Sequence, residues 1–205
     1  MVGSVAERRA ATSLYLNAFV VGGVLMGFEM LGSRYLFPYF GGGIGTWAGL
    51  ISMVLIALTI GYFAGGAIVD RHPSPRVIAL AAGAAAVYLA AVPVTADHVM
   101  SWILTSVGAG LPGILLAAAA LVLMPLSFLG TFSPVAVRLL IRSTSETGRV
   151  AGLVYGISTL GNVFGILFTT FTLIPTLGSR SITYLFAAVL AACATSLFLI
   201  AKGVR

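Results

Sequence analysis

Gly27-Phe-Glu-Met-Leu-Gly-Ser-Arg34 lies inside a long apolar run that extends from residue 13 to residue 37. The run is long enough to cross a bilayer, because a spanning helix needs about 20 mostly apolar residues. Within it, Glu29 and Arg34 introduce two opposite charges. A charge inside hydrocarbon is costly and by default marks a functional site or its structural counter-ion. The stretch therefore predicts a membrane-spanning helix and marks where function is to be sought.

The composition of the whole chain agrees with a membrane protein. Of the 205 residues, 60% are hydrophobic and 8% are charged. Ordinary soluble domains carry about 25% charged residues, so there are too few polar groups to cover a surface that faces water. The net charge of +6 does not predict a nucleic-acid partner, because the basic residues are scattered at the ends of apolar runs.

Six apolar runs are long enough to span a bilayer. They cover residues 13–37, 46–69, 77–95, 111–140, 150–177 and 182–201. The fourth run contains Pro125 and Pro134, which predict a bent helix. Residues 97–110 are too short and polar to span, and they predict a short amphipathic helix on the outer surface.

The positions of the basic residues predict the orientation. With the N-terminus in the cytoplasm, nine Lys and Arg residues lie inside, Arg180 lies outside, and Arg34 is undecided. Cytoplasmic loops carry an excess of Lys and Arg, so both termini are expected in the cytoplasm and the chain in the cytoplasmic (inner) membrane.

A weak internal repeat divides the chain into halves. Gly45-Thr-Trp-Ala-Gly-Leu opens the second run, and Gly148-Arg-Val-Ala-Gly-Leu opens the fifth. The second run starts outside and the fifth starts inside, which is the arrangement of inverted-repeat transporters. We therefore expect an all-α integral membrane protein of six helices, built as two inverted three-helix repeats.

Glycines recur at helical spacing in four pairs. Each pair places two flat spots on one helix face, so that helix backbones can approach closely. We expect packing inside one subunit rather than a dedicated dimer face. The pairs are Gly23 with Gly27, Gly61 with Gly65, Gly152 with Gly156, and Gly161 with Gly165.

Glu29 is the leading candidate for chemistry, and three interpretations stay open. It pairs with Arg34, it takes a proton as part of coupling, or it binds the ammonium group of a substrate. Arg34 is five residues on, about 140° around the helix, whereas spacings of three or four face each other. Arg34 itself lies near the outer end, where it is expected to reach the headgroups.

Polar residues on the fourth and fifth runs are further candidates. Asn162 cannot satisfy its own amide and needs a partner, either across a helix interface or in a cavity. Ser127 and Ser133 lie on the fourth run, where hydroxyls commonly bond to their own helix.

The turn between the second and third runs carries Asp70, Arg71 and Arg76. It is either an ordinary topology-setting loop or an ion pair that gates the cytoplasmic side. His72 and His98 fall on opposite sides, and the sequence holds no Cys/His cluster and no nucleotide or nucleophile motif. We expect no metal, no cofactor and no enzymatic activity.

Three motifs resemble the membrane part of the fused MFS/spermidine synthase family. The most specific is Glu29-Met-Leu-Gly-Ser-Arg34-Tyr-Leu-Phe-Pro38-Tyr-Phe-Gly41. The others are Gly61-Tyr-Phe-Ala-Gly-Gly-Ala-Ile-Val-Asp70-Arg71, and Ser158-Thr-Leu-Gly-Asn-Val-Phe-Gly165 followed by Leu173-Ile-Pro175-Thr-Leu-Gly178-Ser-Arg180.

The resemblance implies half of a major-facilitator-like fold, in which the first and fourth helices line the cavity. We expect this protein to lack the soluble synthase domain of that family. We expect a small secondary transporter that acts as a homodimer in the lipid bilayer. It would move a cationic or amine-containing solute such as a polyamine, with proton coupling through Glu29. The alternative is a membrane anchor or regulatory subunit for a separate spermidine-synthase-like enzyme. A third hypothesis is a transporter of lipids or of lipid headgroups.

Overall fold

The computed structural model describes residues 5–141 and 143–203, and the basic residues Arg142 and Arg205 lie outside these ranges. In chain order the helical segments are α1 (Val5–Phe40), α2 (Ile44–Arg71), α3 (Pro75–Ser106), α4 (Leu111–Ala118), η1 (Ala119–Leu123), α5 (Met124–Gly130), α6 (Phe132–Leu140), η2 (Thr144–Glu146), α7 (Thr147–Phe168), η3 (Thr169–Leu173), α8 (Ile174–Thr176) and α9 (Ser179–Gly203). No strand occurs in these described ranges.

Six helical spans are long and apolar enough to cross a membrane. The first three are α1, α2 and α3, the fourth combines α4 to α6, the fifth combines η2 to α8, and the sixth is α9. This confirms the six predicted spans and the all-helical class. Within a bilayer a helix satisfies its backbone hydrogen bonds internally, which is why apolar sequence of this length takes this form.

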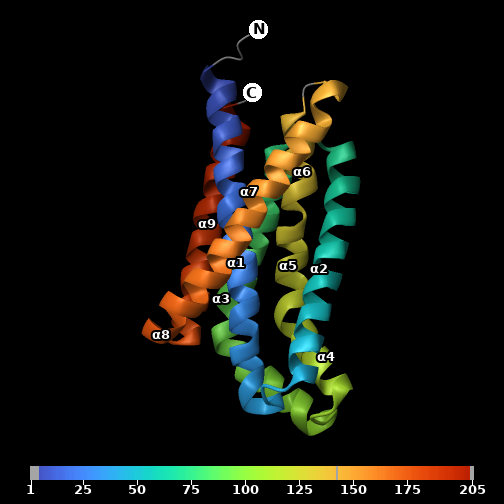
Figure 1. The fold of residues 1–205 in the computed structure, drawn as a ribbon, viewed down its shortest axis with the longest axis vertical. Helices are drawn as coiled ribbons and strands as arrows, with labels where there is room; N and C mark the ends of the chain where they lie inside the picture. The colour runs from blue at the N-terminus through green and yellow to red at the C-terminus, as the bar shows by residue number, and fades with distance from the viewer. Residues whose placement is uncertain (1–4, 142, 204–205) are drawn as a thin grey trace.

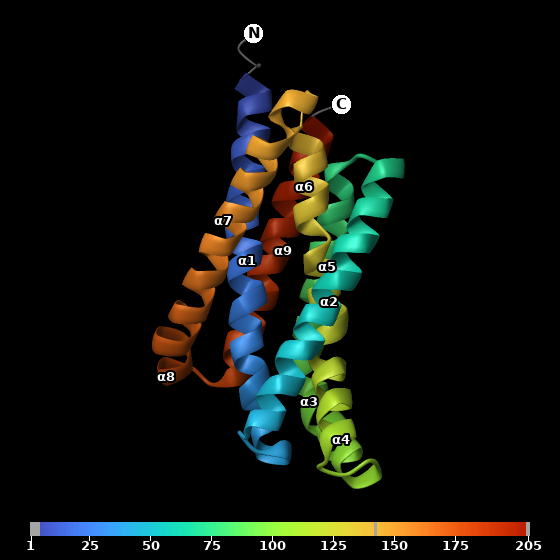
Figure 2. The ribbon, with the colours of Figure 1, turned by 45° about the vertical axis from the view of Figure 1, so that its right-hand side comes forward.

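The spans pair in a simple pattern. The principal contacts join α1 to α7, α3 to α9, and α2 to the fourth span. In Figures 1 and 2, α3 and α9 lie behind α1 and α5, while α2 and α7 lie on the viewer's side of Figure 1. The first and last described residues are at the same end of the bundle (Figure 1). We call this the terminal end; it also holds the α2–α3 and α6–α7 connections.

Close helix contacts are made through glycine. A Cβ atom added to Gly161 would lie 2.0 Å from the Phe19 carbonyl oxygen, and one added to Gly165 would lie 2.1 Å from the Gly23 carbonyl oxygen. Only glycine allows α1 and α7 to approach so closely. Packing inside one subunit is thereby confirmed for this pair of helices.

The pair Gly61 and Gly65 behaves in the same way against the fourth span. Added Cβ atoms there would lie 2.4 Å from the Ser127 carbonyl oxygen and 2.8 Å from the Thr131 Cα atom. By contrast, Cβ atoms added to Gly152 and Gly156 meet nothing within 4 Å. For that pair, the prediction of packing inside one subunit is wrong.

Two wide helical turns precede prolines. The π-helical segments η1 and η3 each end two residues before a proline, Pro125 and Pro175. Pro125 has no N–H to offer the carbonyl of Ala120, and the Tyr88 hydroxyl of α3 donates to that carbonyl instead. A second break, at Thr131 between α5 and α6, precedes Pro134. The predicted irregularity of the fourth span is therefore present.

The third helix differs from its prediction. Instead of ending at residue 95 and giving way to a separate surface helix over residues 97–110, α3 continues without interruption to Ser106. Polar residues such as Asp97 end the apolar span, but they do not end the helix, because nothing between Thr95 and Ser106 breaks its hydrogen bonds. The prediction of a separate surface helix was wrong.

Candidate functional site

A small polar cavity lies between α1, α2, α5, α6 and α7. Its volume is about 30 Å³, which exceeds the 10–15 Å³ or so that one water molecule needs. Four polar side chains line it, and they come from three different helices. These are Tyr62 of α2, Ser133 of α6, and Ser158 and Asn162 of α7. The cavity therefore has both the room and the hydrogen-bonding groups to hold a small polar guest.

Asn162 joins α7 to α1 at this cavity. With its amide oriented as its neighbours require, the side-chain nitrogen donates to the Gly22 carbonyl at 2.9 Å and to the Ser158 carbonyl at 3.2 Å. The absence of a side chain at Gly22 makes the approach possible, since a Cβ there would lie 2.4 Å from the Ser158 carbonyl oxygen. The predicted interhelical hydrogen bond of Asn162 is confirmed, and the residue also lines the cavity.

The two candidate serines of the fourth span have different surroundings. Ser127 donates to the Leu123 carbonyl of its own helix at 2.6 Å and does not line the cavity. Ser133 is 8% exposed, lines the cavity, and has no hydrogen-bond partner in the described part of the chain. Its hydroxyl is therefore available to a guest.

Glu29 is buried, with 7% of its surface exposed. It lies one turn beyond Leu25, which lines the cavity, and seven residues beyond Gly22. Spacings of four and seven share one helix face, so Glu29 continues the cavity-lining side of α1. At 1.5 Å per residue it is about 6 Å from Leu25 along the helix axis, away from the terminal end.

Few buried polar side chains in the described ranges lack a partner. Hydrogen bonds satisfy four of the seven: Asn17, Thr46, Thr131 and Thr183. The remaining three, Glu29, Ser133 and Thr169, make no hydrogen bond to a described residue, and of these only the Thr169 hydroxyl is closed off from solvent completely. Buried polar groups are normally hydrogen-bonded, so unpaired ones deserve an explanation. Two of the three, Glu29 and Ser133, belong to the cavity or to its extension along α1.

Arg34 is not brought to the cavity. The side chain is exposed, and among the described residues it makes no ion pair with Glu29. The 140° offset between the two positions on one helix is the physical reason. An ion pair on the same helix is thus excluded as the partner of Glu29.

The turn after α2 is exposed at Asp70 and Arg71, with Arg76 half-buried at the start of α3. No ion pair joins these three side chains to one another in the region described. At the opposite end of the bundle, Arg180 of α9 pairs with Asp97 of α3, a contact that the sequence did not indicate. The gating role of Asp70, Arg71 and Arg76 stays a prediction.

Tyr62 was missed at the sequence level, as was Tyr155 beside it. The two phenolic groups are close enough to interact electrostatically. A signal was present, because tyrosines in spanning helices favour the membrane interfaces. Tyr62 lies nine residues before the end of α2, and Tyr155 lies eight residues after the start of α7. A tyrosine so far from a helix end indicates a polar contact for its hydroxyl.

The geometry defines a multi-pass helical membrane protein with one polar cavity beside an unpaired carboxyl group. Within residues 5–141 and 143–203, no three His, Cys, Asp or Glu side chains are grouped to hold a metal ion. In comparisons with known proteins, no family model, no curated protein and no solved structure matched the chain. Its resemblance to spermidine-synthase-like membrane proteins therefore rests on the motifs alone.

Proposed function

We propose that the chain is a small secondary transporter and that Glu29 is its cation site. The single observation that carries the proposal is the burial of an unpaired carboxyl group on the cavity side of α1. An ionised carboxylate in a low-dielectric interior is costly unless a cation accompanies it. A proton or an organic ammonium group relieves that cost, and exchange between the two couples solute movement to a proton gradient.

The helix pairing supports an inverted repeat within this unit. If spans one to three are exchanged with spans four to six, the α1–α7 contact becomes the contact between the fourth span and α2. The α3–α9 contact, between spans three and six, is unchanged by this exchange. All three principal contacts are therefore consistent with a repeat of three spans. This pattern favours two three-helix repeats of opposite orientation, which is how many secondary transporters are built. It is the arrangement expected of half of a major-facilitator-like fold.

The resemblance of the first span to spermidine-synthase-like membrane proteins favours an amine as the solute. A polyamine offers ammonium groups to Glu29 and N–H donors to the hydroxyls of Ser133 and Ser158. Two six-helix units, oriented with the basic ends in the cytoplasm, would enclose one pathway as a homodimer.

The proposal is tested by flux of labelled putrescine and spermidine into proteoliposomes, with and without a pH gradient. Glu29→Gln keeps the size of the side chain and removes its ionisable group. We expect the variant to lose at least tenfold in gradient-driven flux. Glu146→Gln is the matched control, because it makes the same change in η2, at the terminal end of the fifth span and away from the cavity, and is expected to retain flux.

Equal flux and equal pH dependence in Glu29→Gln and Glu146→Gln, in folded protein, would refute the role of Glu29. Absence of amine flux in the unaltered protein would refute the choice of solute.

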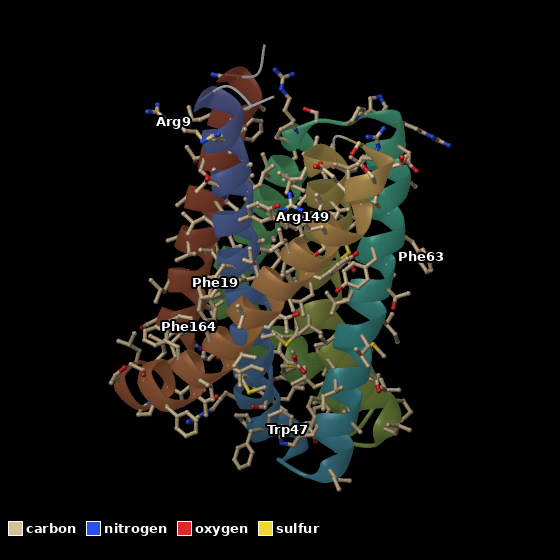
Figure 3. All side chains as sticks on the ribbon, turned by 45° about the horizontal axis from the view of Figure 1, so that its top comes forward. Arg9, Phe19, Trp47, Phe63, Arg149 and Phe164 are labelled. Carbon is tan, nitrogen blue, oxygen red and sulfur yellow. The ribbon has the colours of Figure 1, made fainter. Side chains whose placement is uncertain are left out.

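One observation favours the alternative function as well. The terminal end exposes Arg8, Arg9, Arg71, Arg138 and Arg149, and Figure 3 shows Arg9 and Arg149 there. Such a surface suits an acidic protein partner. A membrane anchor for a separate synthase-like enzyme would therefore form a stable, salt-sensitive complex and carry no solute flux.

A further inference from the structure

The two least buried spans lie on the same side of the bundle. In an apolar 18-residue stretch of α2 and of the span that contains α7, 22% of the residues are buried, against 39–61% in such stretches of the other four spans. Figure 2 shows α7 on the left and α2 on the right of the side that faces the viewer, with α1 between them and α3 and α9 behind. We call the side formed by α2 and α7, with α1 and α5 between them, the open face.

Polar side chains gather on this open face within the membrane-spanning region. Tyr62 is 42% exposed and Tyr155 is 46% exposed, and Thr159 is exposed beside them. Tyr62 also lines the cavity, together with Ser158 and Asn162. Polar residues in spanning helices almost always face protein or a water-filled space, so hydrocarbon is an unsuitable cover for this face.

Some of the most exposed apolar side chains of these two helices lie on other sides. Phe63 is 77% exposed, and Figure 3 shows it pointing away from the bundle. On α7, Leu160 is 64% exposed and lies about 140° around the helix from Tyr155, counting 100° per residue. Phe63 and Leu160 therefore face away from the tyrosines, and the open face is the side on which the exposed polar side chains gather.

The two edges of the open face have complementary shapes. Along α7, Gly148, Gly152 and Gly156 leave a flat surface on which an added Cβ meets nothing within 4 Å. Along α2, the exposed side chains are large, with Leu55 at 59% exposure next to Tyr62. By contrast, a Cβ added to a glycine that packs inside the subunit, such as Gly161, would clash with a neighbouring helix. The glycines of this stripe are thus free to receive side chains from a second molecule.

We propose that a second copy of this chain covers the open face, with α2 of each copy packed on α7 of the other. Both copies have the same orientation in the membrane, so the two-fold axis runs along the membrane normal through the middle of the face. A two-fold axis there places the bulky α2 edge of each copy on the flat α7 edge of its partner. The polar cavity then lies between two subunits rather than against lipid.

This inference deepens the proposed transporter, since it assigns the surface on which the two units meet. It does not depend on which solute is carried. A monomer would leave the exposed tyrosines of α2 and α7, of which Tyr62 lines the cavity, in contact with hydrocarbon, so the site is incomplete without the partner copy.

The test is disulfide crosslinking between differently tagged copies co-expressed in membranes. Cys193, the only cysteine of the chain, is first replaced by serine. One copy then carries Thr59→Cys and the other Thr159→Cys. Thr59 precedes the last residue of α2 by 12 positions, and Thr159 follows the first residue of α7 by 12. Both helix ends are at the terminal end of the bundle, so the two positions lie at the same depth.

The matched control moves each cysteine by one residue, to Ile60→Cys and Leu160→Cys. These positions are 47% and 64% exposed and lie about 100° around their helices from Thr59 and Thr159. Disulfides need Cα atoms about 4.4–6.8 Å apart, so the one-residue shift of about 100° is decisive. We expect the mixed dimer to form at least fivefold more efficiently with the first pair than with the control pair.

Equal crosslinking of both pairs, or crosslinking of the control pair alone, would overturn the interface. So would a chain that elutes as a monomer in detergent and gives no mixed dimer in membranes. Crosslinking at Thr59 and Thr159 without amine flux would leave the interface standing and refute the transporter. Flux without crosslinking would support the transporter and refute the interface. The two proposals can therefore be refuted independently.

Discussion

The α1–α7 contact offers the sharpest stability prediction, through Gly165→Ala. The added Cβ atom would lie 2.1 Å from the Gly23 carbonyl oxygen and 2.7 Å from the Gly23 Cα atom. Carbon and oxygen atoms in close contact normally lie about 3.3–3.6 Å apart. The two helices must therefore separate by more than about 1 Å at this point.

Such a separation removes attraction along the whole contact. A gap of about 0.5–1 Å already forfeits a quarter to a half of the dispersion energy of an atom pair. Overpacking of this kind costs about 1–3 kcal/mol. Since Asn162 of α7 bonds to the Gly22 carbonyl of α1, the same movement also weakens the hydrogen bond at the cavity.

The measurement is unfolding of the purified protein in mixed detergent micelles, followed by the loss of helical circular dichroism. Gly83→Ala is the matched control, because its added Cβ would lie 3.8 Å from the Ala194 Cβ, an ordinary contact. That change is expected to be neutral or stabilising by up to about 1 kcal/mol, since alanine favours helix more than glycine does. If Gly165→Ala proves as stable as Gly83→Ala, the close approach of α1 and α7 is wrong.

Two further predictions concern polar contacts between helices. Tyr88→Phe leaves the Ala120 carbonyl, which Pro125 cannot serve, without its donor, so we expect a loss of about 1 kcal/mol in the free energy of unfolding. A variant as stable as the unaltered protein in the same micelle assay would argue against that bond. For Asp97→Asn, whose pair with Arg180 is more than half exposed on both sides, we expect a change of less than about 1 kcal/mol that shrinks further in high salt; a larger, salt-insensitive loss would contradict a surface pair.

The irregular fourth span illustrates what local chemistry predicts. Pro125 and Pro134 lack N–H groups wherever they are placed, so a disturbed helix was predictable from those residues alone. That the Tyr88 hydroxyl would satisfy the freed carbonyl was not predictable. It depends on how α3 and the fourth span are rotated against each other, and 32 residues separate the two groups.

The third helix illustrates a failure of local chemistry. The polar Asp97 and His98 follow an apolar run, and the length of that run predicts a helix that ends at residue 95. Helix formation depends on backbone hydrogen bonds and not on lipid contact, so α3 continues beyond the apolar region to Ser106. Apolar length therefore predicted the span correctly and the helix end incorrectly.

The six spans, the all-helical class and the position of Glu29 inside a span were readable from the sequence by itself. Each depends on the transfer of side chains from water to hydrocarbon, a property of each residue and its immediate neighbours. Only the tertiary structure decided that Asn162, Ser133 and Tyr62 share one cavity. It also decided that Arg34 stays apart from Glu29, and that Gly152 and Gly156 face outward. The physical reason is that glycine contacts set the tilt and rotation of each helix, and these contacts join residues as far as 66 to 142 positions apart, as Gly61 with Ser127 and Gly161 with Phe19 show.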